Sequence, residues 1–203
     1  MKKLQYLLEA FILLLLLCVL RVIGLKNARS MMAWLVYNIG KRHKSHRVVL
    51  KNLSHVFPEK KNAEKEQLAQ KIWWHLGAVM AEYPYLGKIV ANKAVEITGA
   101  EHLKKHSQIL IMSAHIGNWE LGSRIFAQLG FPVASVYRAA NNPYADRLLA
   151  KCRQAGAQSE VPLFPKGMRA MRQMLSYLKQ GGNVGMLLDQ KLGEGVDIDF
   201  FGK

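Results

Sequence analysis

Acidic residues are scarce in this chain of 203 residues, which has 14 Asp and Glu against 29 Lys and Arg and a formal net charge of +15. Between Glu9 and Glu59 there is no acidic residue at all. The basic residues of that stretch are Arg21, Lys26, Arg29, Lys41, Arg42, Lys44, Arg47 and Lys51. Such a charge balance favours anionic partners, which leaves nucleic acid, acidic protein and a membrane surface as candidates.

Cysteine is also rare, since Cys18 and Cys152 are the only two. A disulfide framework is therefore not indicated, and a reducing, cytoplasm-facing compartment is favoured. The sequence has no internal repeat and no low-complexity segment beyond a leucine run near its start. A hydrophobic fraction of 50% excludes disorder, and the length allows one sizeable core or a small domain with an anchor.

The most apolar segment is residues 6–25, "YLLEAFILLLLLCVLRVIGL". Its uncharged core, residues 10–20, is shorter than the roughly 20 residues that a membrane span needs, but Glu9 and Arg21 lie near the ends and can snorkel. We expect a membrane anchor or an embedded interfacial helix over residues 1–27. A removed signal peptide or a buried core helix is the alternative, although no small-x-small cleavage site follows.

The acid-free basic flank supports the membrane interpretation, because each cation near anionic lipid contributes about 1 kcal/mol. More Lys and Arg follow the apolar segment than precede it, so the positive-inside rule places the rest of the chain in the cytoplasm. A solvated basic face is the alternative, but it does not account for the missing acids.

Helical periodicity continues after the apolar segment and predicts a basic helical lead-in over residues 28–93. Its expected helices cover residues 28–39, 46–57 and 62–83, with Asn62 as a cap of the last. From residue 94 on, short apolar runs alternate with helical patterns. Strands are expected at residues 95–98, 108–113, 132–137, about 158–163 and 184–188, and helices at 119–129, 143–154 and 168–179. This alternation predicts an α/β fold with a mostly parallel sheet covered by helices on both faces.

Polar residues follow three of the expected strands, at residues 115–120, 138–142 and 189–190. In parallel α/β sheets, ligands collect where the strands end at their carboxyl side. We therefore expect these three polar segments to line one edge of the sheet.

The first polar segment carries His115 and Glu120 in the sequence "AHIGNWE". On one helix they would point about 140° apart, so we expect His115 to end a strand and a new helix to begin at Gly117 or Asn118. The turn would then bring Glu120 to the imidazole, and the first N–H groups of the helix, capped by Asn118, could bind an oxyanion. A buried strand-end histidine and an ordinary helix-start carboxylate are the alternative for so short a motif.

A histidine base and oxyanion donors are what a hydroxyl needs to attack an acyl group, and a general base contributes about 10² to 10⁴ in rate. No G-x-S-x-G surrounds a serine, and neither cysteine has a partner in the motif. Direct attack by a bound acceptor is therefore favoured over an acyl-enzyme.

"AHIGNWE", followed by "YRAANNP", "VGMLLDQ" and "DFFGK", resembles the late acyltransferases of lipid A biosynthesis, the lauroyl/myristoyl acyltransferase family within the H-x4-D/E acyltransferase class. The earlier "RVVLKNLSHVFPE" is similar to the helical lead-in of that family. The resemblance implies an α/β acyltransferase core over residues 94–203. Because family members continue past "FFG", we expect the carboxy-terminal part of the family fold to be missing from this chain.

The resemblance implies transfer of a fatty acyl chain from acyl carrier protein to a hydroxyl of a lipid A precursor at the cytoplasmic face of the bacterial inner membrane. It implies His115 as the catalytic base with Glu120 as its partner. The substrate-binding residues expected are Asn118, Arg138, Asp189 and Gln190, and for Arg138 and Asp189 a role in organising the site is the alternative. Independently, the planar guanidinium of Arg138 suits bidentate binding of phosphate or carboxylate.

No metal ion or other cofactor is expected. Besides acyl carrier protein and the lipid A precursor, anionic membrane lipid is an expected partner, and nucleic acid is not, because no known binding module accompanies the charge. A noncatalytic or truncated lipid-binding relative at the membrane surface is the alternative to an enzyme.

Overall fold

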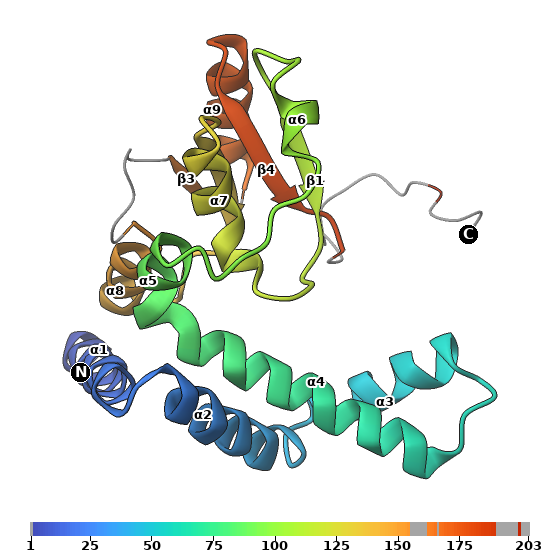
Figure 1. Cartoon of the computed structure of the whole chain (residues 1–203). Coiled ribbons are helices and arrows are strands. Elements are labelled where there is room, and N and C mark those ends of the chain that lie inside the picture. Colours follow the sequence, from blue (N-terminus) through green and yellow to red (C-terminus); the bar gives the residue numbers. More distant parts are fainter. Residues whose placement is uncertain (1, 155–161, 166, 190–198, 200–203) are drawn as a thin grey trace.

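The structure is a computed structural model and describes residues 2–154, 162–165, 167–189 and 199. Helices of the first half form a layer below the α/β half in Figure 1. The elements of this layer are α1 (Lys2–Ile23), α2 (Leu25–Gly40), α3 (Ser45–Val56), α4 (Asn62–Glu82), the 3₁₀ turn η1 (Tyr83–Tyr85) and α5 (Leu86–Ala91). The α/β half contains α6 (Ala100–Leu103), β1 (Leu110–Ser113), the 3₁₀ turn η2 (Trp119–Leu121), α7 (Gly122–Gln128), β2 (Val133–Tyr137), α8 (Pro143–Gln154), β3 (Leu163–Pro165), α9 (Met168–Lys179) and β4 (Asn183–Leu187).

Helices α2 and α4 pack closely along their lengths because a glycine lies where they meet. A Cβ atom on Gly77 would collide with the backbone carbonyl of Met32. At its start α4 is stabilised by Glu64, whose carboxylate accepts the backbone N–H of Lys61 at 2.9 Å. Lys61 is thus the N-cap residue, and Asn62, the expected cap, is the first residue of the helix. The core between the helices consists of Leu20, Ala28, Met32, Ala81, Tyr85, Leu86, Ile89, Val90 and Leu121.

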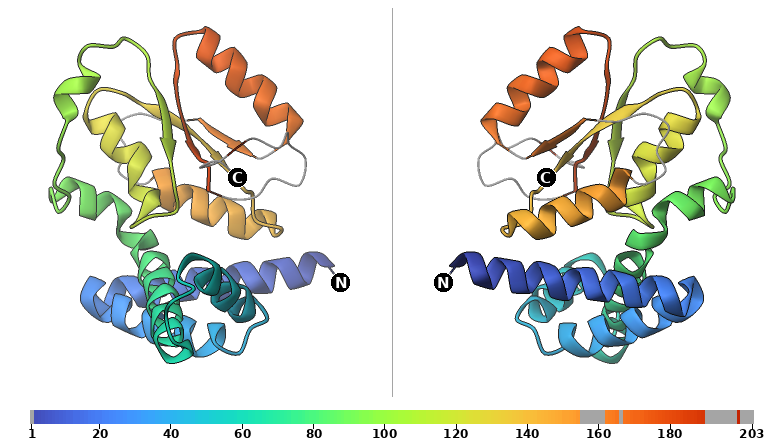
Figure 2. Two further views of the ribbon diagram at one scale, coloured as in Figure 1. Left: turned by 90° about the vertical axis from the view of Figure 1, so that its right-hand side faces the viewer. Right: turned by 90° about the vertical axis from the view of Figure 1, so that its left-hand side faces the viewer.

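Helix α1 is attached to the rest of the molecule at two places. Near its start, the side-chain amide of Asn142 donates to the Tyr6 carbonyl at 2.8 Å and to the Glu9 carboxylate at 2.9 Å. Near its end, the Tyr85 hydroxyl donates to the Leu20 carbonyl at 2.7 Å. Helix α1 therefore lies along the body of the protein, beside α8 and α2 (Figure 2).

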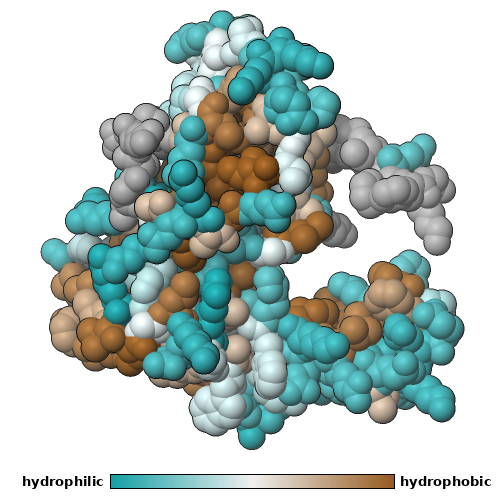
Figure 3. All heavy atoms as spheres, viewed as in Figure 1, coloured by the Kyte–Doolittle hydropathy of each residue, from teal (hydrophilic) through white to brown (hydrophobic). Residues whose placement is uncertain are grey.

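The outer face of α1 is apolar and exposed. Within the described residues, α1 is the helix that is long and apolar enough to cross a membrane. Figure 3 shows this hydrophobic surface at the lower left, where α1 lies in Figure 1. Its exposed members are Leu4, Leu7, Leu8, Phe11, Ile12, Leu14, Leu15, Val19 and Val22.

The sheet is parallel throughout, with the strand order β1-β4-β2-β3. Helices α7 and α9 lie on opposite sides of it, as the two views of Figure 2 show. On the α9 side, the sheet core is built from Ala134, Phe164, Ala170 and Val184. The predicted parallel sheet covered by helices on both faces is confirmed.

Four of the five predicted strands correspond to β1 to β4: β1 and β2 end where predicted and begin one or two residues later, and β4 is shifted by one residue. For the strand expected near residues 158–163, the structure has β3 at Leu163–Pro165, and residues 158–161 lie outside the described part. Residues 95–98 form no strand, so that prediction is wrong. Val95 packs against the helical core, and a left-handed Gly99 follows the segment.

Candidate active site

The carboxyl ends of the strands open into a cavity of about 500 Å³, a size within the range of about 300 to 1,000 Å³ that is typical of ligand sites. Its polar lining includes His115, Glu120, Tyr137, Arg138 and Arg153. Its apolar lining includes Ile111, Phe126, Val133, Val136, Leu163, Met186 and Leu187. The polar segments that follow β1 and β2, two of the three expected at this edge of the sheet, contribute to the lining. The third segment follows β4, and its Asp189 binds His115.

His115 and Asp189 meet because their strands are neighbours. Ser113 of β1 pairs with Leu187 of β4, and each strand continues two residues to a polar side chain. One carboxylate oxygen of Asp189 lies 2.7 Å from Nδ1 of His115, and the other accepts the backbone N–H of His115 at 2.8 Å. The imidazole also contacts the Trp119 ring edge-on, with 4.9 Å between centroids. Ring and backbone of His115 are therefore fixed by one carboxylate.

The bond to Asp189 determines the tautomer of His115. An ionised carboxylate only accepts hydrogen bonds, so Nδ1 of the imidazole carries the hydrogen. In the neutral ring Nε2 then holds the lone pair, which is the state that a general base requires.

The Asp189 carboxyl is ionised at neutral pH. Desolvation alone would raise its pKa, but the hydrogen bonds from the side chain and the backbone of His115 outweigh this and lower the pKa. Asp189 can therefore stabilise an imidazolium formed at His115.

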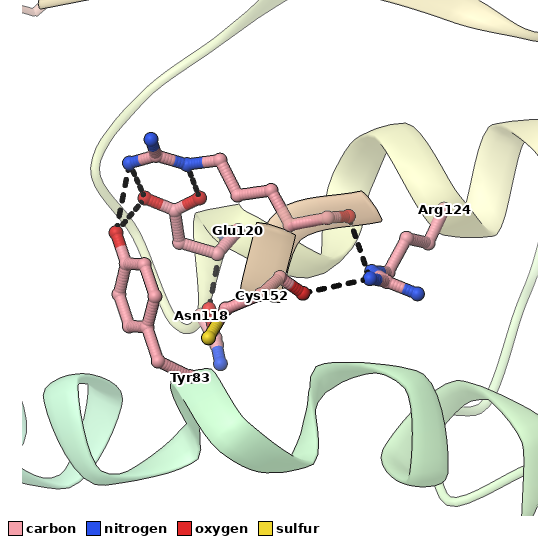
Figure 4. A network of polar contacts seen from close by, with 6 residues as sticks. Tyr83, Asn118, Glu120, Arg124 and Cys152 are labelled. Carbon is pink, nitrogen blue, oxygen red and sulfur yellow. Dashed lines mark hydrogen bonds and ion pairs between the residues drawn. The ribbon is translucent and has the colours of Figure 1, made fainter. Parts of the chain in front are cut away.

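Glu120 has different partners from those expected. Its carboxylate forms a two-pronged ion pair with Arg153 of α8, from Nε at 2.7 Å and from Nη2 at 2.9 Å. The hydroxyl of Tyr83 donates a hydrogen bond to the same carboxylate and accepts one from Arg153 at 2.9 Å. Figure 4 shows Tyr83 and Glu120 turned toward each other in this cluster. The Glu120 carboxylate, expected from the motif to be the partner of His115, thus binds Arg153, and Asp189 binds the imidazole.

Burial makes the Tyr83–Glu120–Arg153 cluster tight. Desolvation would raise the pKa of Glu120, but the bonds from Arg153 and Tyr83 outweigh it and lower the pKa. Desolvation and the neighbouring Glu120 charge raise the pKa of Tyr83, so the phenol stays protonated. Desolvation would lower the pKa of Arg153, but Glu120 raises it. All three groups therefore keep one protonation state at neutral pH.

Arg153 is fixed on several sides. Its guanidinium lies 5.5 Å from the ring centre of Tyr83 and 5.4 Å from that of Tyr137, both within cation–π range. Its backbone carbonyl accepts from the buried Arg124 of α7 at 2.6 Å. No local sequence motif predicts Arg153 or Tyr83, because each lies more than 30 residues from Glu120.

Asn118 caps the turn after β1, as expected, since its side-chain oxygen accepts the N–H of Glu120 at 3.0 Å. The N–H of Leu121 is bonded to the Asn118 carbonyl. The helix begins with the short 3₁₀ turn η2, so these two amides are engaged within the turn. They are therefore not among the donors available to an oxyanion.

The remaining residues of the expected polar segments lie in different places. Arg138 follows β2 and lines the cavity with His115. Asn142, from the same polar segment, is buried, and its side-chain nitrogen donates to α1. Its side-chain oxygen accepts the N–H of Tyr144 at 3.0 Å at the start of α8. Gln190 lies outside the described residues.

A histidine held by a carboxylate, beside a cavity lined by Arg138, Arg153 and apolar side chains, is a site suited to transfer of an acyl group. The sequence matches the family described as bacterial lipid A biosynthesis acyltransferase over residues 1–203, so the chain belongs to this family. It is therefore an acyltransferase of lipid A biosynthesis, with a lipid A precursor as the implied substrate. No curated protein and no solved structure gave a significant match.

Proposed function

We propose that the protein transfers a fatty acyl chain from the thioester of acyl carrier protein to a hydroxyl of a lipid A precursor, with His115 as the general base. The observation that carries this proposal is the bond between Asp189 and Nδ1 of His115 at the edge of the cavity. In contrast to the expectation from the motif, Asp189 orients the base, and Glu120 acts by holding Arg153.

The proposed reaction is a direct acyl transfer. The acceptor oxygen attacks the thioester carbonyl carbon while Nε2 of His115 takes the hydroxyl proton. The resulting imidazolium is stabilised by Asp189. The carbon–sulfur bond then breaks, and the thiolate of the carrier protein leaves with the proton from His115. The products are the ester and the free thiol, and no covalent enzyme intermediate forms.

The cavity lining provides a place for both parts of the donor. The apolar side chains between β1, β2 and α7 suit the acyl chain, whose burial contributes about 0.8 kcal/mol per CH₂. Arg138, which lines the same cavity, suits a phosphate of the lipid or of the carrier's prosthetic group.

We further propose that α1 lies within the interface of the bacterial inner membrane and that the α/β half faces the cytoplasm. The two attachments of α1, at Glu9 and at Leu20, support this arrangement. A helix crossing the bilayer would carry one of these two contact sites into the hydrocarbon. A helix in the membrane plane keeps both contacts and presents its apolar face to lipid.

Anionic lipid and the acidic carrier protein would both be attracted by the basic residues that follow α1. Sedimentation of the full chain with vesicles tests the membrane part of the proposal. We expect high salt alone to leave the protein bound, because the apolar face of α1 supplies most of the attraction. Full release by salt would contradict it.

The catalytic part is tested with purified protein, acyl carrier protein loaded with a fatty acid, and a lipid A precursor. Once turnover of the parent is measured, His115→Ala should lower kcat by about 10² to 10⁴ while folding and vesicle binding remain. An unchanged kcat would make His115 structural. Binding of the lipid without any turnover of the parent would support the noncatalytic alternative.

A further inference from the structure

Side chains of the helical layer hold the turn that follows His115. In that turn Gly117 has a φ of +59°, so the chain passes through a left-handed conformation. Such a turn has few internal constraints, because glycine is the most flexible residue. The contacts from α4 and η1 are His75 to the Gly117 carbonyl at 2.9 Å, Glu82 to the Asn118 amide, and Tyr83 to the Glu120 carboxylate.

Glu82 is the most buried of these contacts. It is 6% exposed and accepts hydrogen bonds from two different parts of the chain. Arg29 of α2 donates to one of its oxygens at 2.6 Å, and the side-chain amide of Asn118 donates to the other. A buried carboxylate needs such donors, since an unpaired charge there would be costly.

The bond to Glu82 also fixes which way the Asn118 amide faces. A carboxylate can only accept, so the nitrogen of the amide faces Glu82. The amide oxygen must then face the opposite partner, the N–H of Glu120, which it accepts at 3.0 Å. Glu82 therefore determines both ends of the Asn118 side chain, and through them the path of the turn between His115 and Glu120.

We propose that Glu82, supported by Arg29, is a positioning residue for acyl transfer: it holds the turn so that His115 stays aligned with the cavity. This rests on the proposed role of His115 as the base. Glu82 does not line the cavity, and it acts on the reaction through Asn118. A small displacement of a catalytic group can cost about 100-fold in rate, so a bond outside the cavity can control turnover.

An exchange of donor and acceptor tests the proposal. In Glu82→Gln, the new amide can accept from Arg29 or from Asn118, but its nitrogen must face the other donor. In Asn118→Asp, two carboxylates would face each other in a buried place. We expect each single variant to lower kcat about tenfold, with KM for the acyl donor little changed, because hydrogen bonds to charged groups are strong.

The double variant, Glu82→Gln with Asn118→Asp, restores every bond with the roles reversed. The amide oxygen at position 82 accepts from Arg29, and its nitrogen donates to Asp at position 118. That carboxylate still accepts the N–H of Glu120, since Asp is as good a cap as Asn. We expect kcat to return to within about threefold of the parent, as strong coupling of neighbouring sites predicts.

A second measurement follows the position of His115 without catalysis. Diethyl pyrocarbonate modifies imidazoles, and peptide mass spectrometry gives the rate at His115 separately from that at other histidines. The rate should change at least threefold in each single variant and return in the double variant. If His115→Ala proved fully active, the proposed function would fail, but the modification rate would still decide whether Glu82 positions the turn.

The matched control is Glu64→Gln, the same chemical change in the first turn of α4, where Glu64 stabilises the start of the helix. It should lower the thermal midpoint slightly and leave kcat and the modification rate unchanged. Single variants with parental kcat and parental modification rate would overturn the proposal. A double variant that regained its thermal midpoint but neither kcat nor the modification rate would also overturn it, because Glu82 would then be only structural.

Discussion

The two carboxylates of the candidate site, Glu120 and Asp189, have opposite surroundings. The side chain of Glu120 is 11% exposed and shares its two oxygens between Arg153 and Tyr83. The side chain of Asp189 is 39% exposed and bonds to the ring and backbone of His115. One carboxylate belongs to a buried cluster between layers, and the other to an open pair at the end of two strands.

This difference separates a carboxylate held in a buried ion pair from a carboxylate that stays open to solvent beside His115. A buried ion pair with full hydrogen bonding resists any change of charge, because either partner alone would be uncompensated. An open pair is screened by solvent, so its charges contribute less to the stability of the fold. The motif spacing relates His115 to Glu120, but in the structure His115 pairs with Asp189 and Glu120 pairs with Arg153.

The largest effect is expected from removing one charge of the buried pair. Arg153→Met should lower the free energy of unfolding by about 3 to 5 kcal/mol, because it leaves the Glu120 carboxylate buried without a counter-charge. Chemical denaturation measures this loss. The double variant, Arg153→Met with Glu120→Gln, should lose clearly less free energy of unfolding than Arg153→Met alone. If Arg153→Met lowered the free energy of unfolding by less than about 1 kcal/mol, the Glu120 carboxylate would not depend on its buried ion pair, and the contrast with Asp189 would fail.

A large effect on turnover, but not on stability, is expected at the open pair. Asp189→Asn should lower kcat about 100-fold, because a general base contributes a factor of about 10² to 10⁴ to the rate. The new amide can donate to Nδ1 and so favours the tautomer that cannot accept a proton at Nε2. The free energy of unfolding should change by less than about 1 kcal/mol. Full activity of this variant would remove Asp189 from the mechanism.

A smaller effect is expected from Tyr83→Phe, which removes one hydroxyl from the buried cluster and leaves the ring over Arg153. The loss of a hydrogen bond to a charged group should cost about 1.5 kcal/mol of folding stability. Thermal and chemical unfolding measure it, with Tyr37→Phe on α2 as the matched control. Equal stability of the two variants would contradict a supporting role for the Tyr83 hydroxyl.

The smallest effect is expected from mild acidification. The pKa of Glu120 is lowered by folding, so its stabilising contribution is fully present above the ordinary value of 4.5 and is lost as the pH falls through the folded pKa. Between pH 7 and about 5.5 the Glu120 contribution should therefore be flat. Unfolding curves of parent and Glu120→Gln should converge only below about pH 4.5, and a difference that vanished near pH 6 would contradict the lowered pKa.

Much of the architecture follows from local sequence patterns. Within the described residues, helices α8 and α9 have the predicted bounds because their apolar residues recur with helical period. The segment at residues 95–98 shows the limit of such patterns. A short apolar run is equally suited to a strand or to packing against helices, and its neighbours in space decide between the two.

The same distinction between local patterns and neighbours in space holds for the candidate site. By itself, the sequence determined that His115 would follow a strand, that Asn118 would cap the next turn, and that Arg138 would reach the same edge of the sheet. Each of these depends on a few neighbouring residues and on the rule that parallel strands end together. The tertiary structure alone decided that Asp189 binds His115 and that Arg153 and Tyr83 bind Glu120. Such pairings are formed by residues far apart in the chain, and the order of strands β1 and β4 and the packing of α8 on the helical layer determine which of them meet.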